Sequence, residues 1–212
     1  MSKQQYLIFG AGAIGATVAA WLAEPQLENE IEVSVFDRQD TIDTINKNGI
    51  EVYLGEEPTK RYLSRVKAYS NLDDVPKPDV IIICVKNYSL GGVSSILVEK
   101  FGDTTPVIGL QNGVENQQIL PKFFKKVIYG VVCYNAWVDE SAVIGYQKKG
   151  PIALGHHGGV TEQEIQSIAN TMNKAVDTQV YPKLNDAAHS KIIINLTNSL
   201  TTLVALHEND LS

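Results

Sequence analysis

Three glycines near the amino end have the spacing of a phosphate-binding loop. Gly10, Gly12 and Gly15 form the pattern G-x-G-x-x-G directly after a short apolar run, residues 6–9. In that pattern the first glycine permits a tight turn, the second lets a pyrophosphate approach the backbone, and the third lets a helix pack against the strand. The helix that follows directs N–H groups and the positive end of its dipole at the phosphates. The motif predicts a dinucleotide site formed by Gly10, Ala11, Gly12, Ala13, Ile14 and Gly15.

The residues around this loop favour a dinucleotide site over a glycine-rich turn of some other α/β fold. We expect a strand at residues 6–9, a helix at 13–23 and a second strand at 31–36, which leads into Asp37 and Arg38. A carboxylate at this position suits a ribose 2′-hydroxyl and therefore NAD, whereas the guanidinium beside it suits the 2′-phosphate of NADP. These residues leave both cofactors open.

Two further polar residues follow the ends of expected parallel strands. Residues 80–85 are the most continuously apolar run of the chain, which predicts a central strand buried on both faces, and Lys86 follows it. Residues 106–110 predict the next strand, and Asn112 lies in the turn after it. Ligands of an open parallel sheet bind beyond the carboxyl ends of its strands. Lys86 and Asn112 are therefore candidate site residues.

A polar stripe marks the last expected helix. Residues 185–206 contain no glycine or proline and are largely apolar. At 100° per residue, their polar members Lys191, Asn195, Asn198 and Thr202 fall within about 60° of one another. We interpret the stripe as the wall of a cleft in which Lys191 donates a proton or binds a carboxylate, while Asn195 and Asn198 hold substrate oxygens. The alternative is that the stripe is simply the solvent face of the helix.

The remaining pattern predicts an α/β fold, a Rossmann-type doubly wound parallel sheet with antiparallel additions. Asp40 is expected to cap a helix that ends at Asn48-Gly49. Residues 50–54 and 62–69 predict a hairpin at the sheet edge. After these, the sequence predicts short strands at 127–134, 136–138, 142–147 and 152–154, a helix at 161–175 and a strand at 178–181.

Composition narrows the classes of partner. The 212 residues carry a net charge of −6, which argues against a nucleic-acid or anionic-membrane surface. Cys84 and Cys133 lie in apolar runs and are expected to be buried thiols, and the His156-His157 pair is interpreted as a surface turn, so no metal site is predicted. The first strand begins within five residues of the N-terminus and no apolar run reaches membrane-spanning length, which leads us to expect a cytoplasmic protein.

The chain resembles the ketopantoate reductase (2-dehydropantoate 2-reductase) family along its whole length. The resemblance rests on an ordered set of motifs, especially Gln-Asn-Gly after a parallel strand followed much later by a Lys-x-x-x-Asn helix. The set comprises Gly10-x-Gly12-x-x-Gly15, the strand ending Val35-Phe36-Asp37-Arg38, Cys84-Val85-Lys86, Gln111-Asn112-Gly113-Val114-Glu115-Asn116 and Lys191-x-x-x-Asn195-x-x-Asn198.

This resemblance implies NADPH-dependent reduction of 2-dehydropantoate to pantoate, on the route to pantothenate and coenzyme A. It implies that Lys191 is the general acid and that Asn195 and Asn198 bind substrate. Val85 and Lys86 would bind the cofactor, with Lys86 beside its nicotinamide end, and Asn112 would contact cofactor and substrate. It favours NADP, with NAD the alternative because of Asp37.

The resemblance also implies two domains. Residues 1–182 would form the NAD(P)-binding Rossmann domain, and residues 183–212 would begin a helical second domain whose remainder lies outside this sequence. We therefore expect a fragment or a shortened homologue with incomplete catalysis, and a homodimer through residues 185–206, whose apolar face needs a partner. The alternatives are a non-catalytic dinucleotide-binding regulatory module and a reductase of another 2-oxo or 3-oxo acid.

Overall fold

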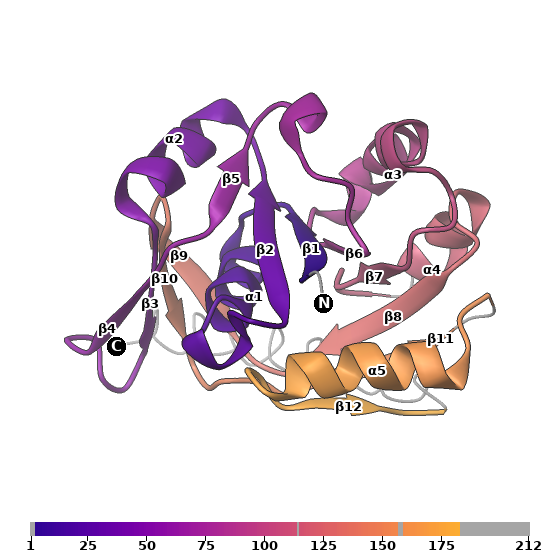
Figure 1. Ribbon diagram of the computed structural model, residues 1–212. Coiled ribbons are helices and arrows are strands. Elements are labelled where there is room, and N and C mark those ends of the chain that lie inside the picture. Colours follow the sequence, from indigo (N-terminus) through magenta and orange to yellow (C-terminus); the bar gives the residue numbers. More distant parts are fainter. Residues whose placement is uncertain (1–2, 114, 157–158, 183–212) are drawn as a thin grey trace, which may run out of the picture.

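Two β-sheets form the framework of the computed structural model, which describes residues 3–113, 115–156 and 159–182 (Figure 1). The main sheet has eight strands and the smaller one has four. Across the main sheet the strands are β12 (Thr178–Val180), β11 (Ile152–His156), β8 (Val127–Val132), β7 (Val107–Gly109), β6 (Val80–Ile83), β1 (Gln4–Phe9), β2 (Ile31–Phe36) and β5 (Lys67–Tyr69). Across the small sheet they are β4 (Arg61–Ser64), β3 (Ile50–Leu54), β10 (Val143–Tyr146) and β9 (Ala136–Glu140).

The helices connect these strands and cover both faces of the main sheet. They are α1 (Ala13–Leu22), α2 (Gln39–Asn48), α3 (Asn87–Phe101), α4 (Asn116–Ile119) and α5 (Glu162–Asn173), with short 3₁₀ turns at Pro25–Leu27, Leu72–Asp74 and Leu120–Lys122. The strands from β8 to β5 run parallel, whereas β11 is antiparallel to β8 and β12 follows the direction of β11. The prediction of a Rossmann-type parallel sheet with antiparallel additions is confirmed.

Alternating side chains of the central strands fill two separate cores. Along β1, Tyr6 and Ile8 belong to the core that also holds the buried residues of α1 and α5, whereas Leu7 packs with residues of α3 on the opposite face. In β6, Ile82 faces the first core and Ile81 the second. Successive side chains of a strand point to opposite faces, so a continuously apolar strand requires cover on both sides. This is why residues 80–85 could be recognised as a central strand.

Helix α1 lies between the main sheet and the small sheet. It contacts β1 and β2 on one side and β3, β9 and β10 on the other. Eight of its ten residues, from Gly15 to Leu22, are buried, because the helix has sheet on both sides. Its C-terminal end packs Trp21 edge-on against Tyr146, with ring centroids 5.2 Å apart. The N-terminus of α1 is therefore held in a fixed direction.

The expected edge hairpin is wrong in its second half. Strands β3 and β4 do form an antiparallel hairpin, but in the small sheet, while β5 separates from β4 and joins the main sheet beside β2. Ser64 Oγ donates a hydrogen bond to Ala20 O at 3.0 Å, which holds the end of β4 against α1. Lys67 then pairs with Glu32 at 2.6 Å, which holds β5 against β2. These two contacts end β4 at Ser64 and begin β5 at Lys67, so the stretch predicted as one strand is interrupted at residues 65–66.

Three other expectations need correction. Strands β9 and β10 do not extend the main sheet, because β10 pairs with β3 of the small sheet. Arg38, not Asp40, is the N-cap residue of α2, and it makes no side-chain capping bond. Cys133 is exposed because β8 ends at Val132, whereas Cys84 is half-buried just beyond β6.

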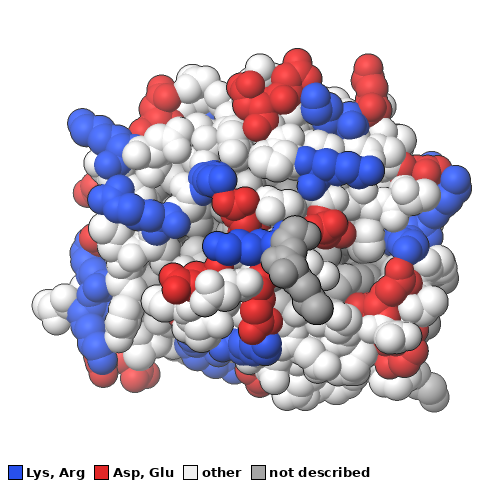
Figure 2. Space-filling model, viewed as in Figure 1, with Lys and Arg blue, Asp and Glu red and all other residues white. Residues whose placement is uncertain are grey.

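Charges of both signs are interspersed over the face of the molecule seen in Figure 2. Among the described residues no group of three or more His, Cys, Asp and Glu side chains is arranged to hold a metal ion. In that same part of the chain, none of the helices has the length and apolar character needed to cross a membrane.

Candidate functional site

The candidate site is a cleft of about 230 Å³ at the carboxyl ends of β1 and β6. In the sheet order, β1 lies between β6 and β2, and the connections leaving β1 and β6 place α1 and α3 on opposite faces. A crevice opens where the winding reverses in this way, and ligands of open α/β sheets bind there. The cleft is lined by Gly12, Ala13, Ile14, Cys84, Lys86, Val132, Tyr134, Asn135, Ala136 and Asn112.

The glycine loop has the geometry that its spacing predicts. Gly10 has φ +102°, a value that L side chains rarely adopt, and Val85 Cγ1 would lie 3.1 Å from a Cβ placed there. A Cβ on Gly15 would lie 1.8 Å from Gly10 O, so only glycine permits this contact between helix and loop. At Gly12, by contrast, a Cβ would meet nothing within 4 Å. Backbone at Gly12 therefore faces open space.

The first turn of α1 is available to an anion. Gly12 is its N-cap residue, no side chain caps it, and its first turn carries no acidic residue. The first N–H groups of a helix have no intrahelical partner, and the helix dipole favours negative charge beside them. Together with the open space at Gly12, these backbone groups fit the pyrophosphate of a dinucleotide.

Two side-chain amides, the buried Gln111 and the half-buried Asn87, hold the turns after β6 and β7 together. Gln111 Nε2 donates to Ile83 O at 2.7 Å, and Asn87 Nδ2 donates to Asn112 O at 2.9 Å. These bonds bring Lys86, which is exposed, and Asn112 to the same end of the sheet as Gly12. The cleft thus brings together Lys86, Asn112 and the glycine loop, which the sequence predicted as site residues.

At the end of β2, the Asp37 carboxylate contacts the glycine loop. Its Oδ2 accepts a hydrogen bond from Ala11 N at 2.5 Å, and its Oδ1 accepts one from Arg38 N at 2.7 Å. Arg38 Nε lies 3.9 Å from Asp37 Oδ1, with the arginine side chain 81% exposed. Both residues are thus next to the loop, as a ribose-binding position requires.

Sequence reasoning missed the wall supplied by the segment after β8. Tyr134 is buried, and its hydroxyl shares a hydrogen bond with Thr17 Oγ1 of α1 at 3.0 Å. Burial raises the pKa of the Tyr134 hydroxyl, while the hydrogen bond with Thr17 opposes part of that rise. Tyr134 therefore stays neutral and serves as packing. The strand order, which places β8 beside β7, was the missing information.

Cys84 lies in the cleft but is poorly suited to be a nucleophile. Burial raises the pKa of its thiol to about 12, so the group remains protonated near neutral pH. Of the residues predicted to do chemistry, Lys191, Asn195 and Asn198 lie outside the described residues. The described part of the cleft supplies binding groups: backbone N–H donors, an exposed ammonium and an amide.

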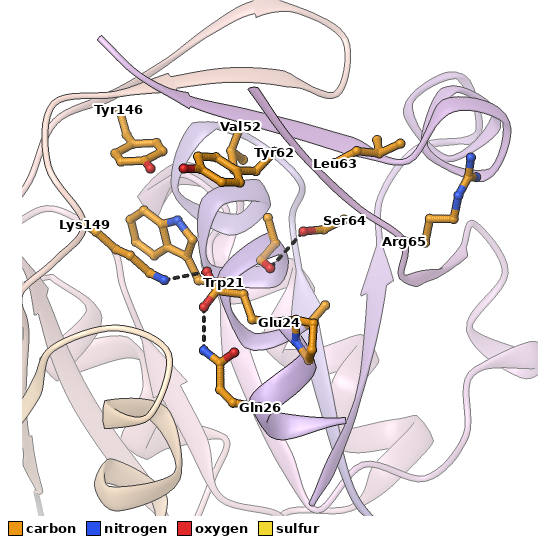
Figure 3. Close-up of a pocket in the computed structure, with 13 residues that line it drawn as sticks. Trp21, Glu24, Gln26, Val52, Tyr62, Leu63, Ser64, Arg65, Tyr146 and Lys149 are labelled. Carbon is orange, nitrogen blue, oxygen red and sulfur yellow. Dashed lines mark hydrogen bonds and ion pairs between the residues drawn. The ribbon is translucent and has the colours of Figure 1, made fainter. Parts of the chain in front are cut away.

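A larger groove, of about 570 Å³, lies at the opposite end of α1 (Figure 3). Trp21, Tyr62 and Tyr146 gather along it, and Lys149 Nζ is paired with Glu24 Oε1 at 2.5 Å. Gln26 Nε2 donates to the other Glu24 oxygen at 2.6 Å. We place the functional site in the smaller cleft, because ligands of this sheet type bind at the carboxyl ends of the strands.

The doubly wound sheet and its glycine loop define the chain as a Rossmann-type α/β protein. The family model for ketopantoate reductase PanE/ApbA matches residues 6–159. The chain belongs to this family.

Relatives support the same family. A 2-dehydropantoate 2-reductase of Pyrococcus horikoshii is 27% identical over 89% of this chain and 60% of the relative. One from Archaeoglobus fulgidus is 30% identical over 82% of this chain and 55% of the relative. The chain thus spans a little over half of the length of these relatives.

Solved structures agree on the fold. A 2-dehydropantoate 2-reductase from Geobacter metallireducens GS-15 has a TM-score of 0.77 at 25% identity, covering 90% of this chain and 62% of that one. D-mandelate dehydrogenase, solved with NADH and anilino(oxo)acetate, has a TM-score of 0.78 at 20% identity, covering 91% of this chain and 61% of that one. At that identity the second likeness concerns the fold alone.

Proposed function

We propose that this chain carries the cofactor-binding part of an NADPH-dependent 2-dehydropantoate 2-reductase, which converts 2-dehydropantoate to pantoate for pantothenate and coenzyme A synthesis. The observation that carries the proposal is the cleft in which Gly12, Lys86 and Asn112 meet, in a chain of the ketopantoate reductase family. Residues 1–182 would be the Rossmann domain, and 183–212 the beginning of a helical second domain.

The cofactor would lie across the carboxyl ends of β1, β2 and β6. The loop from Gly10 to Gly15 would bind the pyrophosphate through backbone N–H groups, since Gly12 faces open space and no side chain caps α1. Val85 would also contact the cofactor, and Lys86 would lie beside its nicotinamide end. At the ribose end we propose NADP, because the exposed Arg38 guanidinium suits a 2′-phosphate, with NAD the alternative because of Asp37.

The chemistry would reduce a ketone to an alcohol. The cofactor held by the glycine loop, Val85 and Lys86 would supply the hydride that the carbonyl carbon of the 2-oxo acid accepts. Lys191 would protonate the carbonyl oxygen as it gains alkoxide character, because an ammonium at that atom stabilises the developing negative charge. Asn195 and Asn198 would hold substrate oxygens, and Asn112 would contact cofactor and substrate.

Binding and turnover test this proposal separately. NADPH fluorescence measures binding, and loss of absorbance on adding 2-dehydropantoate measures reduction. NADPH binding without turnover would identify the chain as a catalytically incomplete fragment. Where the parent reduces 2-dehydropantoate, we expect Lys191→Ala to abolish reduction and to leave NADPH affinity within about twofold, because the proton donor is not needed to bind cofactor. Equal loss of both would contradict the role of Lys191, and reduction of other 2-oxo acids alone would contradict the substrate.

We also propose that the chain forms a homodimer through residues 185–206, whose apolar residues would otherwise be exposed. Sedimentation at micromolar concentration tests this, and a monomer under those conditions would contradict it. Neither a nucleic acid nor a membrane surface is a proposed partner, and a cytoplasmic location stays a prediction from the sequence.

A further inference from the structure

The carboxylate of Asp37 accepts hydrogen bonds from a distant segment, the glycine loop, and from the amide of the next residue in the chain. Its Oδ2 accepts from Ala11 N of the glycine loop at 2.5 Å, and its Oδ1 accepts from Arg38 N at the start of α2 at 2.7 Å. The side chain is only 20% exposed. Hydrogen bonds to an ionised acceptor are shorter and stronger than those between neutral groups. Asp37 therefore joins the end of β2 to the loop that follows β1.

The Ala11 N–H needs this acceptor. Ala11 is 8% exposed, and it sits between Gly10, whose N–H donates to Phe36 O at 2.9 Å, and Gly12, whose carbonyl accepts the first hydrogen bond of α1 from Ala16 N at 2.8 Å. This hydrogen bond is part-buried, and an N–H that loses its partner there is costly, so removal of the Asp37 acceptor should loosen the loop. The carboxylate thus fixes the backbone that faces the cleft.

We propose that Asp37 is a positioning residue, which holds the glycine loop in the shape that receives pyrophosphate. This inference rests on the proposed function. It differs from the role expected from the sequence, in which Asp37 acts by choosing between a ribose hydroxyl and a 2′-phosphate. Arg38 is better placed to make that choice, because its side chain is 81% exposed and can move toward a phosphate.

The two roles predict opposite changes in NADPH affinity. A carboxylate that only selects against the 2′-phosphate would, once removed, let NADPH bind more tightly. A carboxylate that holds the loop would, once removed, weaken the pyrophosphate site, which NADH and NADPH share. Loss of affinity for NADPH, despite removal of a nearby negative charge, is therefore the distinguishing result.

The test compares Asp37→Asn and Asp37→Ala with Asp40→Asn, which removes an exposed carboxylate from the first turn of α2. We expect both Asp37 variants to bind NADH and NADPH at least fivefold more weakly, with the alanine variant weaker, because asparagine can keep only one of the two acceptor bonds. Asp40→Asn should stay within twofold of the parent. Unchanged or tighter NADPH binding by the Asp37 variants would overturn the proposal.

A second measurement needs no cofactor. Amide hydrogen exchange of the unliganded chain should be at least tenfold faster at Ala11 in Asp37→Ala, while amides in the centre of β6 keep their protection. Equal exchange at Ala11 in parent and variant would overturn the loop-holding role. Failure of the parent to bind either dinucleotide would instead refute the proposed function, and the exchange data would still decide the role of Asp37.

Discussion

The glycines of the loop have the different physical roles that the sequence pattern predicts. A Cβ on Gly15 would collide with Gly10 O, whereas a Cβ on Gly12 would point into the open cleft. Gly15 is thus required by packing and Gly12 by access. The sequence pattern predicted both roles but not how close the contact at Gly15 is, because the distance between helix and loop is a property of the folded backbone.

Gly15→Ala should destabilise the fold far more than Gly12→Ala. The added methyl at Gly15 must displace α1 from the loop, and overpacking of this kind costs about 3 kcal/mol. At Gly12 the backbone has φ −69°, which alanine adopts readily, so the cost should stay below about 1 kcal/mol. Urea unfolding measures both values. Equal destabilisation by the two substitutions would contradict the assigned roles.

At the scale of elements, the sequence predicted the strands that are buried on both faces. It did not predict which of the two sheets a strand joins. Residues 31–36 were predicted with the bounds that β2 has. The run at 62–69 was not resolved into β4 and β5, because the anchors that divide it, Ser64 to Ala20 and Lys67 to Glu32, come from distant segments. Alternation of apolar and polar residues along a strand indicates that one face is buried, but it does not indicate in which sheet the strand lies.

Helix α5 begins with a capping box that also carries a pH-dependent ion pair. Thr161 Oγ1 accepts from Glu164 N at 3.2 Å, and Glu164 Oε2 accepts from Thr161 N at 2.8 Å. The hydrogen bond from Lys126, followed by those from Thr161, lowers the pKa of the Glu164 carboxyl to about 2. Lys126 and Glu164 side chains are 32% and 34% exposed, so water screens part of this interaction.

Glu164→Gln should therefore cost stability at neutral pH and progressively less in acid. Because the folded pKa is lowered, the carboxylate stabilises the fold above its unfolded pKa of about 4.3 and loses that contribution as the pH falls toward about 2. Urea unfolding of parent and variant between pH 6 and pH 2.5 measures the difference. Glu99→Gln, at an exposed carboxylate of α3, is the control. A difference that stays constant across this range would contradict the assignment.

At the scale of the whole molecule, the cleft depends on strand order. Gly12, Lys86 and Asn112 come from three connections that meet because β1, β6 and β7 are neighbours in the sheet. Their convergence could be predicted, since residues after parallel strands share one edge. The wall at Tyr134 and Asn135 could not, because nothing in the local pattern places the segment after β8 against α1.

NADPH bound in the cleft between Gly12, Lys86 and Asn112 should stabilise the whole α/β unit against unfolding. The loop, β6 and β7 belong to one hydrogen-bonded sheet, so a ligand that binds only the folded state shifts the entire unfolding equilibrium. At a hundredfold excess over its dissociation constant, NADPH should add about 2.7 kcal/mol to the free energy of unfolding. Denaturant curves with and without NADPH measure this. No shift at saturating NADPH would contradict binding to the folded state.

The most direct test of the central claim, that the cleft at Gly12 binds a nicotinamide dinucleotide, is titration of the parent and of Gly12→Ala with NADPH, followed by fluorescence. The structure predicts saturable binding by the parent and at least a tenfold weaker affinity in the variant, whose methyl would occupy the open space beside the first turn of α1. Circular dichroism should confirm that the variant is folded. Equal affinity of the two proteins, or no binding by the parent, would contradict the account.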